Sequence, residues 1–343
     1  MNQRGARRDR REVMVTSSEA GLAALVPAWS RLWRDDPRAT PFQAPAWLLP
    51  WARHYAPGRF AIIGWREGGE LVALLPVFHW QGTLYLAGTG PSDYGDVLVQ
   101  RGRAPARLAG EFMDALVDFA DCHRLGRIEL RQLRIDSPLL GGHPPSGWQS
   151  STGGDLQCTV LPLLGEDPLG GQSGHWRRNL RRAERMLRDA GAELRGLPHA
   201  GAAAAGSSVV ALHRERWRAR GEEGVIDQRL ARFITDAVPS LHAAGILRYH
   251  CIEHGGRAVA ALLGMSGAAS VHAWLCGFEP EWSRASPGTL VTVAAIRGAV
   301  AEGARSFHML RGREAYKYDL GAEDRPTWRR RLRRNQHTAT GSA

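Results

Sequence analysis

The pattern of apolar and polar residues along the chain predicts an alternation of strands and helices. Apolar residues spaced three and four apart indicate helices at 21–33, 105–123, 175–190 and 208–218, and another that begins at Ser286. Short apolar runs with turn residues between them indicate strands. The predicted strands are 60–65, 71–78, 84–87, 97–99, 127–131, 247–253, 258–265, 271–276 and 307–310.

This pattern occurs twice in the sequence. A strand–strand–strand–helix–strand order surrounds Gly68-Gly69 and again surrounds Gly255-Gly256, and each glycine pair predicts a tight hairpin turn. Aligning the two glycine pairs also matches apolar strand positions, Val72 with Val259 among them. We therefore predict an internal duplication of one α/β unit.

The predicted domains follow from this duplication and from composition. The first α/β half covers 13–140 and the second covers 175–333, with mixed sheets flanked by helices. Between them, 141–174 is rich in Gly, Pro and Ser and reads as a linker with one short strand at 158–163. The basic segment 1–12 and the polar segment 334–343 are predicted to be disordered tails.

The composition of the chain indicates its charge, the state of its cysteines and its cellular location. The 343 residues carry a formal net charge of +11, which favours anionic partners, although part of it lies in the tails. The four cysteines form no CxxC pair and fit no zinc spacing, so we expect reduced thiols and no metal site. No apolar run reaches the ~18 residues of a membrane span, and no signal-peptide core is visible. We expect a cytoplasmic protein.

The helix at 175–190 is strongly basic. Its apolar residues form one stripe that includes Trp176, Leu180 and Leu187, and six arginines lie off that stripe. A solvated face of a packed helix explains this pattern, and so does a contact with phosphate groups. The sequence leaves both interpretations open.

The start of the helix at Ser286 has the composition of an anion site. Ser286 suits the N-cap position and Pro287 suits the first helical position. Gly288 weakens a helix, and a ligand that must approach the backbone would explain its presence. An ordinary capped helix remains the simpler interpretation.

Lys317 is the only lysine among the 45 basic residues of the chain. A lysine that persists in so arginine-rich a sequence suggests a need for a compact ammonium group. We expect Lys317 to be functional, and we expect Lys317→Arg to behave as a surface change that leaves the melting temperature within a few degrees.

Several segments together resemble a known family. Over about 15–333 the chain resembles the CelD-like acetyltransferases of cellulose biosynthesis, which have the GNAT fold and are distant relatives of the FemAB aminoacyltransferases. The matching segments are Pro41–Trp47, Ser92–Asp96, Leu212–Trp217 with Arg220-Gly221, Gly277–Pro280, Ser286–Gly288 and Leu310–Lys317. The glycine-rich run that usually precedes the pyrophosphate-binding helix is reduced here to Ser-Pro-Gly.

The resemblance implies a tandem GNAT-like α/β fold and an enzyme that transfers an acetyl or other acyl group from acyl-CoA. The acceptor would be an amine or hydroxyl of a small molecule or saccharide, in envelope or exopolysaccharide biosynthesis. The implied donor-binding residues are Trp274, Cys276, Ser286, Gly288 and Thr289. The implied catalytic residues are Asp96 or Glu314 as base, Tyr316 as acid, and Arg311 or Lys317 as partner of an anionic group. Loop capping or ion pairing is the alternative for Asp96 and Glu314.

Two other classes of protein fit the same sequence. One is a FemAB-like transferase that uses aminoacyl-tRNA, although no heptad-patterned hairpin is visible. The other is a binding protein that has the fold without the activity.

His272 and His308 alternate along predicted strands and are expected to be structural.

Overall fold

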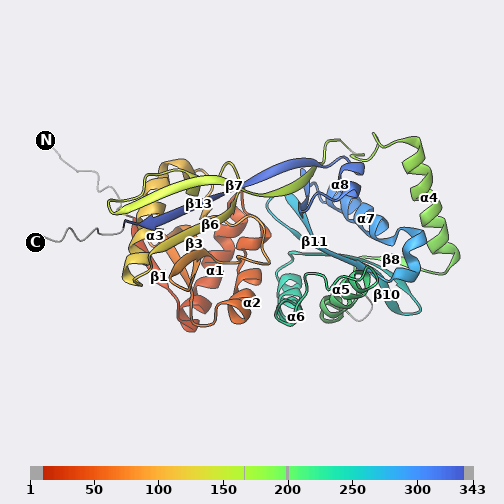
Figure 1. Cartoon of the computed structure of the whole chain (residues 1–343), viewed down its shortest axis with the longest axis horizontal. Coiled ribbons are helices and arrows are strands. Elements are labelled where there is room, and N and C mark those ends of the chain that lie inside the picture. Colours follow the sequence, from red (N-terminus) through yellow and green to blue (C-terminus); the bar gives the residue numbers. More distant parts are fainter. Residues whose placement is uncertain (1–10, 166, 198–200, 336–343) are drawn as a thin grey trace, which may run out of the picture. The chain divides into compact units, whose positions relative to one another are not determined.

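The computed structural model describes residues 11–165, 167–197 and 201–335 (Figure 1). The chain forms two compact units. The first contains 1–48, 56–156 and 326–343, and the second contains 49–55 and 157–325. Both are therefore discontinuous, whereas the sequence predicted two contiguous halves.

The first unit is a mixed sheet with helices packed on it. Its strands follow the order β1-β2-β3-β4-β6-β13-β7, with β5 paired to β3, and β4 and β6 are parallel. The strands are β1 (Glu12–Thr16), β2 (Phe60–Glu67), β3 (Glu70–Trp80), β4 (Thr83–Leu86), β5 (Leu98–Val99) and β6 (Arg127–Leu133). The helices are α1 (Glu19–Asp35), α3 (Ala109–Cys122) and the start of α2 (Pro45–Tyr55), whose residues 49–55 belong to the second unit. Short 3-10 turns η1 (Pro41–Gln43), η2 (Pro105–Leu108) and η3 (Pro138–Leu140) join them.

The second unit repeats this architecture. Its strands follow the order β7-β12-β11-β10-β9-β8, and β11 and β12 are parallel. They are β8 (Glu193–Arg195), β9 (Leu247–His254), β10 (Arg257–Ser266), β11 (Ser270–Phe278) and β12 (Ser306–Arg311). The helices are α4 (Gly174–Asp189), α5 (Gly201–Arg218), α6 (Gln228–Ala243), α7 (Pro287–Ala301) and α8 (Ala315–Asp319), with the 3-10 turn η4 (Pro280–Ala285) before α7.

The predicted duplication is confirmed by the order of these elements. The series β2-β3-β4-α3-β6 in the first unit corresponds to β9-β10-β11-α7-β12 in the second. Gly68 and Gly69 both have positive φ, as do Gly255 and Gly256, which is the geometry of a two-residue hairpin turn. In each series the third strand, β4 or β11, pairs in parallel with the strand that follows the helix, β6 or β12.

Two long strands contribute residues to both units. These are β7 (Trp148–Pro162) and β13 (Glu323–Arg334). The linker predicted at 141–174 is therefore wrong over β7, which is much longer than the short strand expected there. Residues 328–334 form the second part of β13.

The predicted tails lie mostly outside the described residues, in 1–10 and 336–343. Glu12 and Arg334 were predicted to lie in the disordered tails, but Glu12 begins β1 and Arg334 ends β13.

Each unit has its own apolar core between a helix and the sheet. In the first, Phe112 of α3 packs edge-on against Trp65 of β2, with ring centroids 4.9 Å apart. In the second, α7 and α4 pack on one face of the sheet, and Figure 1 shows α5 and α6 on the other. No helix among the described residues has both the length and the apolar character needed to cross a bilayer.

Candidate active site in the second unit

The parallel strands β11 and β12 separate part of the way along their length. Their register pairs Ser270–His272 with Ser306–His308. Beyond His272, β11 continues to Phe278, while the end of β12 pairs with β7 on its other side. Ligands of open α/β sheets bind beyond the carboxyl ends of parallel strands, so this opening is the natural place for a site.

The start of α7 lies next to this opening. Ser286 occupies the predicted N-cap position, but it has a left-handed conformation (φ 46°, ψ 49°) and its side chain makes no capping hydrogen bond. A left-handed conformation is strained for serine, and strained residues of this kind cluster at functional sites. Because the Ser286 side chain does not cap α7, the positive end of the helix dipole remains available to an anion.

Gly288 packs closely against β11. A Cβ atom at this position would lie 3.3 Å from the ring of Phe278 and 3.8 Å from Sγ of Cys276. Gly288 therefore allows the first turn of α7 to approach the strand. The neighbouring Thr289 donates its backbone N–H to the carbonyl of Ser286 at 3.0 Å.

Cys276 and Tyr316 lie near one another at the end of β11. Burial raises the pKa of the Cys276 thiol to about 11. The pKa of Tyr316, on α8, is also raised, first by burial and then by Cys276 and Glu314. At neutral pH both groups are protonated, so Cys276 is a poor nucleophile and Tyr316 is a proton donor.

Arg216 brings positive charge to the same place from α5. Its guanidinium lies over the ring of Phe278, with Cζ 4.9 Å from the centroid. It opposes the rise in pKa of both Cys276 and Tyr316, which places it within electrostatic reach of each. The end of β11 thus combines a phenol, a thiol and a cation beside the start of α7.

His213 is a further polar group at this end of α5, and it is not among the site residues predicted from the sequence. Trp217 donates its indole N–H to Nε2 of His213 at 2.9 Å, so the imidazole proton is on Nδ1. Burial lowers the pKa of His213 to about 4, and the imidazole is neutral at pH 7. Within the described residues, Nδ1 is buried without a hydrogen-bond partner. The only signal in the sequence was the motif Leu212–Trp217.

Gly277 explains why His213 lies so close to β11. A Cβ atom on Gly277 would fall 2.3 Å from the backbone nitrogen of His213, so α5 packs directly on the strand there. The motif segments around 212–217 and 277–280 are therefore brought together.

Lys317 is buried, with 2% of its surface exposed, which corrects the expectation of a surface residue. Its ammonium donates to the carbonyl oxygen of Arg311 at 2.6 Å and forms an ion pair with Glu314 at 3.0 Å. It also donates to the carbonyl of Gly312 at 3.3 Å. Lys317 thus holds the turn between β12 and α8, and it positions Arg311 and Glu314, which are exposed.

Trp274 and Cys276 lie on opposite faces of the sheet. The register between β10 and β11 shifts at Leu263/Gly264, which leaves Trp274 as an extra residue in β11. Trp274 therefore packs edge-on against Phe233 of α6, at 6.4 Å between centroids, whereas Cys276 lies on the side of α7.

Asp96 belongs to the first unit, whereas the other predicted site residues belong to the second. Its carboxylate accepts hydrogen bonds from the Ser137 hydroxyl and from the backbone of Val97, both at 2.8 Å, and Arg38 lies 3.6 Å away. Burial raises its pKa, while Arg38 opposes that rise. These contacts match the loop-capping alternative considered from the sequence.

Among its described residues, the first unit has no equivalent of the α7 start. There, η2 leads directly into α3, and the N-cap residue Leu108 is helical. No left-handed residue separates the two as Ser286 separates η4 from α7.

Comparison with known families agrees with this geometry. Residues 174–318 match the model of the acetyltransferase (GNAT) domain. The matched region includes α7, the end of β11 and Tyr316. No curated protein matches the sequence.

Several solved structures share the fold of the whole chain. FemX superposes with a TM-score of 0.67 at 11% identity, over 93% of this chain and 96% of that one. The C-terminal domain of a putative lysylphosphatidylglycerol synthetase from Agrobacterium fabrum gives 0.59 at 13% identity, over 90% and 92%. A tandem GNAT protein from the clavulanic acid pathway gives 0.51 at 15% identity, over 97% and 100%. The fold is thus a tandem of GNAT-like α/β units, as the sequence predicted.

Proposed function

We propose that this protein is an acyltransferase that uses acyl-CoA as donor and an amine or hydroxyl of a small molecule or saccharide as acceptor. The observation that carries the proposal is the opening between β11 and β12 beside the uncapped start of α7, within the matched GNAT domain. The CelD-like motifs support a saccharide acceptor and a role in envelope or exopolysaccharide biosynthesis.

The residues at this opening fit the parts of acyl-CoA. The start of α7, Ser286–Thr289, presents the positive end of a helix and suits a pyrophosphate group. The end of β11 offers the partly buried surface of Cys276 and Phe278, which suits the largely apolar pantetheine arm. Bound there, acyl-CoA supplies an activated thioester.

The protein then provides orientation and proton transfer. Tyr316 remains protonated because its pKa is raised, and it can protonate the departing sulfur. Glu314 acts as base toward the acceptor, directly or through water, and Lys317 holds its carboxylate in place. Arg216 and Arg311 supply positive charge for an anionic group. Cys276 forms no covalent bond with the acyl group, because its thiol remains protonated.

The reaction can be tested without knowing the acceptor. Acetyl-CoA is incubated with the protein and with a panel of amino sugars, sugars and amines, and release of the free thiol is followed. Acceptor-dependent release supports the proposal. Reaction only with aminoacyl-tRNA would favour the FemAB-like alternative, and binding without turnover would favour a binding protein.

A further inference from the structure

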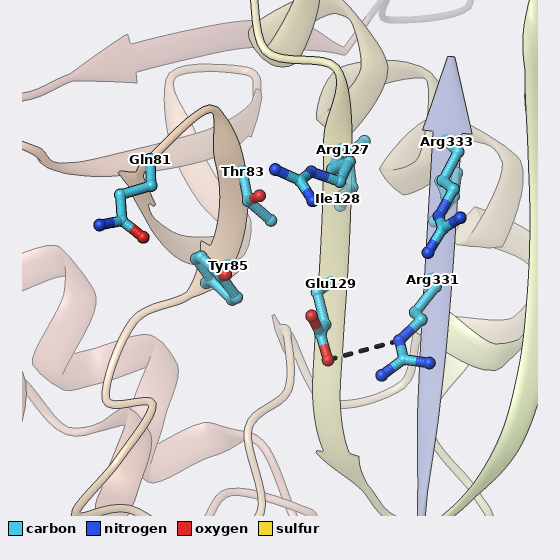
Figure 2. Close-up of a pocket in the computed structure, with 9 residues that line it drawn as sticks. Gln81, Thr83, Tyr85, Arg127, Ile128, Glu129, Arg331 and Arg333 are labelled. Atoms are coloured by element: carbon cyan, nitrogen blue, oxygen red, sulfur yellow. Dashed lines mark ion pairs between the residues drawn. The ribbon is translucent and has the colours of Figure 1, made fainter. Parts of the chain in front are cut away.

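We propose that the first unit contains a second anion-binding site, which takes a small molecule bearing phosphate groups. The site is a pocket of about 340 Å³ on the sheet of the first unit, shown in Figure 2. Its polar lining comes from three strands and one turn and includes Gln81, Thr83, Arg127, Glu129, Arg331 and Arg333. This inference does not depend on the donor site or on the proposed reaction.

The pocket lies on the face of the sheet opposite α3. Alternate residues of these strands, among them Leu84, Ile128 and Leu332, are in the core that packs against α3. Because successive side chains of a strand point to opposite faces, Thr83, Arg127 and Arg333 lie on the other face. Figure 2 shows these side chains projecting from neighbouring strands.

The register of the strands places like charges opposite one another. Arg333 of β13 is directly opposite Arg127 of β6, and Thr83 of β4 is opposite Arg127 on the other side. Like charges at directly opposed positions destabilise a sheet. Within the described residues, neither Arg127 nor Arg333 forms an ion pair. An anion between them would remove this repulsion.

The neighbouring pair of opposed residues on the same face of the sheet carries opposite charges. Arg331 lies opposite Glu129, and their side chains form an ion pair at 3.5 Å. Three arginines and one glutamate therefore leave the pocket with a formal charge of +2.

Phosphate is the chemistry that fits this arrangement. Guanidinium groups bind phosphate through paired hydrogen bonds, and the hydroxyl of Thr83, a buried residue, adds a nearby donor. The volume is at the lower end of the range for small-molecule pockets, which favours a compact ligand over a polymer.

The test is calorimetric titration of the protein with pyrophosphate at low ionic strength, without CoA. Any binding at the start of α7 is common to wild type and the pocket variants, so the difference between them reports the pocket. We expect binding that weakens at least about tenfold in Arg333→Gln, because a charge-assisted contact is lost. Thr83→Val, which keeps the charge and the shape, should also weaken binding.

Arg334→Gln is the matched control. It removes the same charge from the next residue, but Arg334 forms an ion pair with Asp121 and its guanidinium lies over Trp148, away from the pocket. We expect pyrophosphate affinity within about twofold of wild type, because only distant screened charge is lost.

Thermal unfolding gives a second readout. Without ligand, Arg333→Gln should melt no lower than wild type because repulsion is relieved, and pyrophosphate should raise the melting temperature of wild type more than that of the variant. Equal loss of affinity in Arg333→Gln and Arg334→Gln, or no binding to wild type, would overturn the proposal. Binding of an oligonucleotide without binding of pyrophosphate would also overturn it.

Discussion

The buried ammonium of Lys317 donates a hydrogen bond of 2.6 Å to the backbone carbonyl of Arg311. With the carbonyl of Gly312 and the carboxylate of Glu314, this bond fixes the turn that leads into α8 and Tyr316. The single lysine of the chain is therefore a positioning residue beside the candidate site.

Replacing Lys317 should destabilise the protein. Lys317→Met removes charge-assisted hydrogen bonds at a buried position, and we expect a loss of about 2–3 kcal/mol in the free energy of unfolding. Lys317→Arg forces a larger, planar group into the same space and should cost about 1–3 kcal/mol. Urea unfolding measures both.

Glu314→Gln is the control for Lys317, because the Glu314 side chain is 57% exposed. We expect it to change stability by less than about 1 kcal/mol. If Lys317→Arg is as stable as wild type, the variant behaves as a surface change. That result would contradict the role of Lys317 in holding the turn between β12 and α8.

Gly288 should be required for binding CoA. In Gly288→Val the side chain would collide with Phe278 and cover the start of α7, and we expect CoA affinity to fall at least about tenfold. Gly110 is the matched control, because it is also the second residue of its helix, α3, and a Cβ there meets nothing within 4 Å. Calorimetry should show normal CoA binding in Gly110→Val. Equal affinities in the two variants would remove α7 from the donor site.

Tyr316 should act in the chemical step. Loss of a general acid typically lowers turnover by about 100-fold or more, so Tyr316→Phe should reduce kcat to that extent with little change in KM for acyl-CoA. Tyr318, on the same helix, donates to Asp324 at 2.7 Å and is equally exposed, so Tyr318→Phe is the control. Thioester cleavage measures both, and an equal effect of the two changes would argue against proton donation by Tyr316.

The depressed pKa of His213 should make stability depend on pH. The folded imidazole has a pKa of about 4 against an ordinary 6.5, so between these values the unfolded chain binds a proton that the folded protein does not. The stabilisation is complete above about pH 6.5 and is lost as the pH falls toward 4. A shift of about 2.5 pKa units corresponds to about 3 kcal/mol in the free energy of unfolding.

Urea unfolding at pH 7 and pH 5 tests this dependence. In His213→Gln the side chain can still accept a hydrogen bond from Trp217, and the free energy of unfolding should fall less between pH 7 and pH 5. His242→Gln, at an exposed position of α6, should behave as wild type. The same pH dependence in His213→Gln and wild type would mean that His213 does not cause it.

The hairpins and the duplication were predictable because their signals are local. The pairs Gly68-Gly69 and Gly255-Gly256 specify tight turns, and the apolar runs beside them form the predicted strands. The role of β13 was not predictable in this way. Arginines occupy most of its second half, and its pairing with β6 and β7 depends on segments far away in the sequence.

The site was predictable in part. The motif at Ser286–Gly288 identified the start of α7, but the left-handed conformation of Ser286 depends on how η4 packs before it. The bulge at Trp274 cannot be read from spacing, and it separates Trp274 from Cys276. Composition singled out Lys317, whereas its burial follows from the fold of the turn around it. Helix α6 was not predicted, although Phe233, Ala237 and Leu241 recur at helical spacing.

The most direct test of the account is a crystal structure of the protein with CoA. We expect the pyrophosphate beside the backbone of Ser286–Thr289 at the start of α7, and the pantetheine arm along the end of β11 near Cys276 and Tyr316. CoA bound with its thiol away from β11, or bound only in the first unit, would contradict the assignment of the donor site.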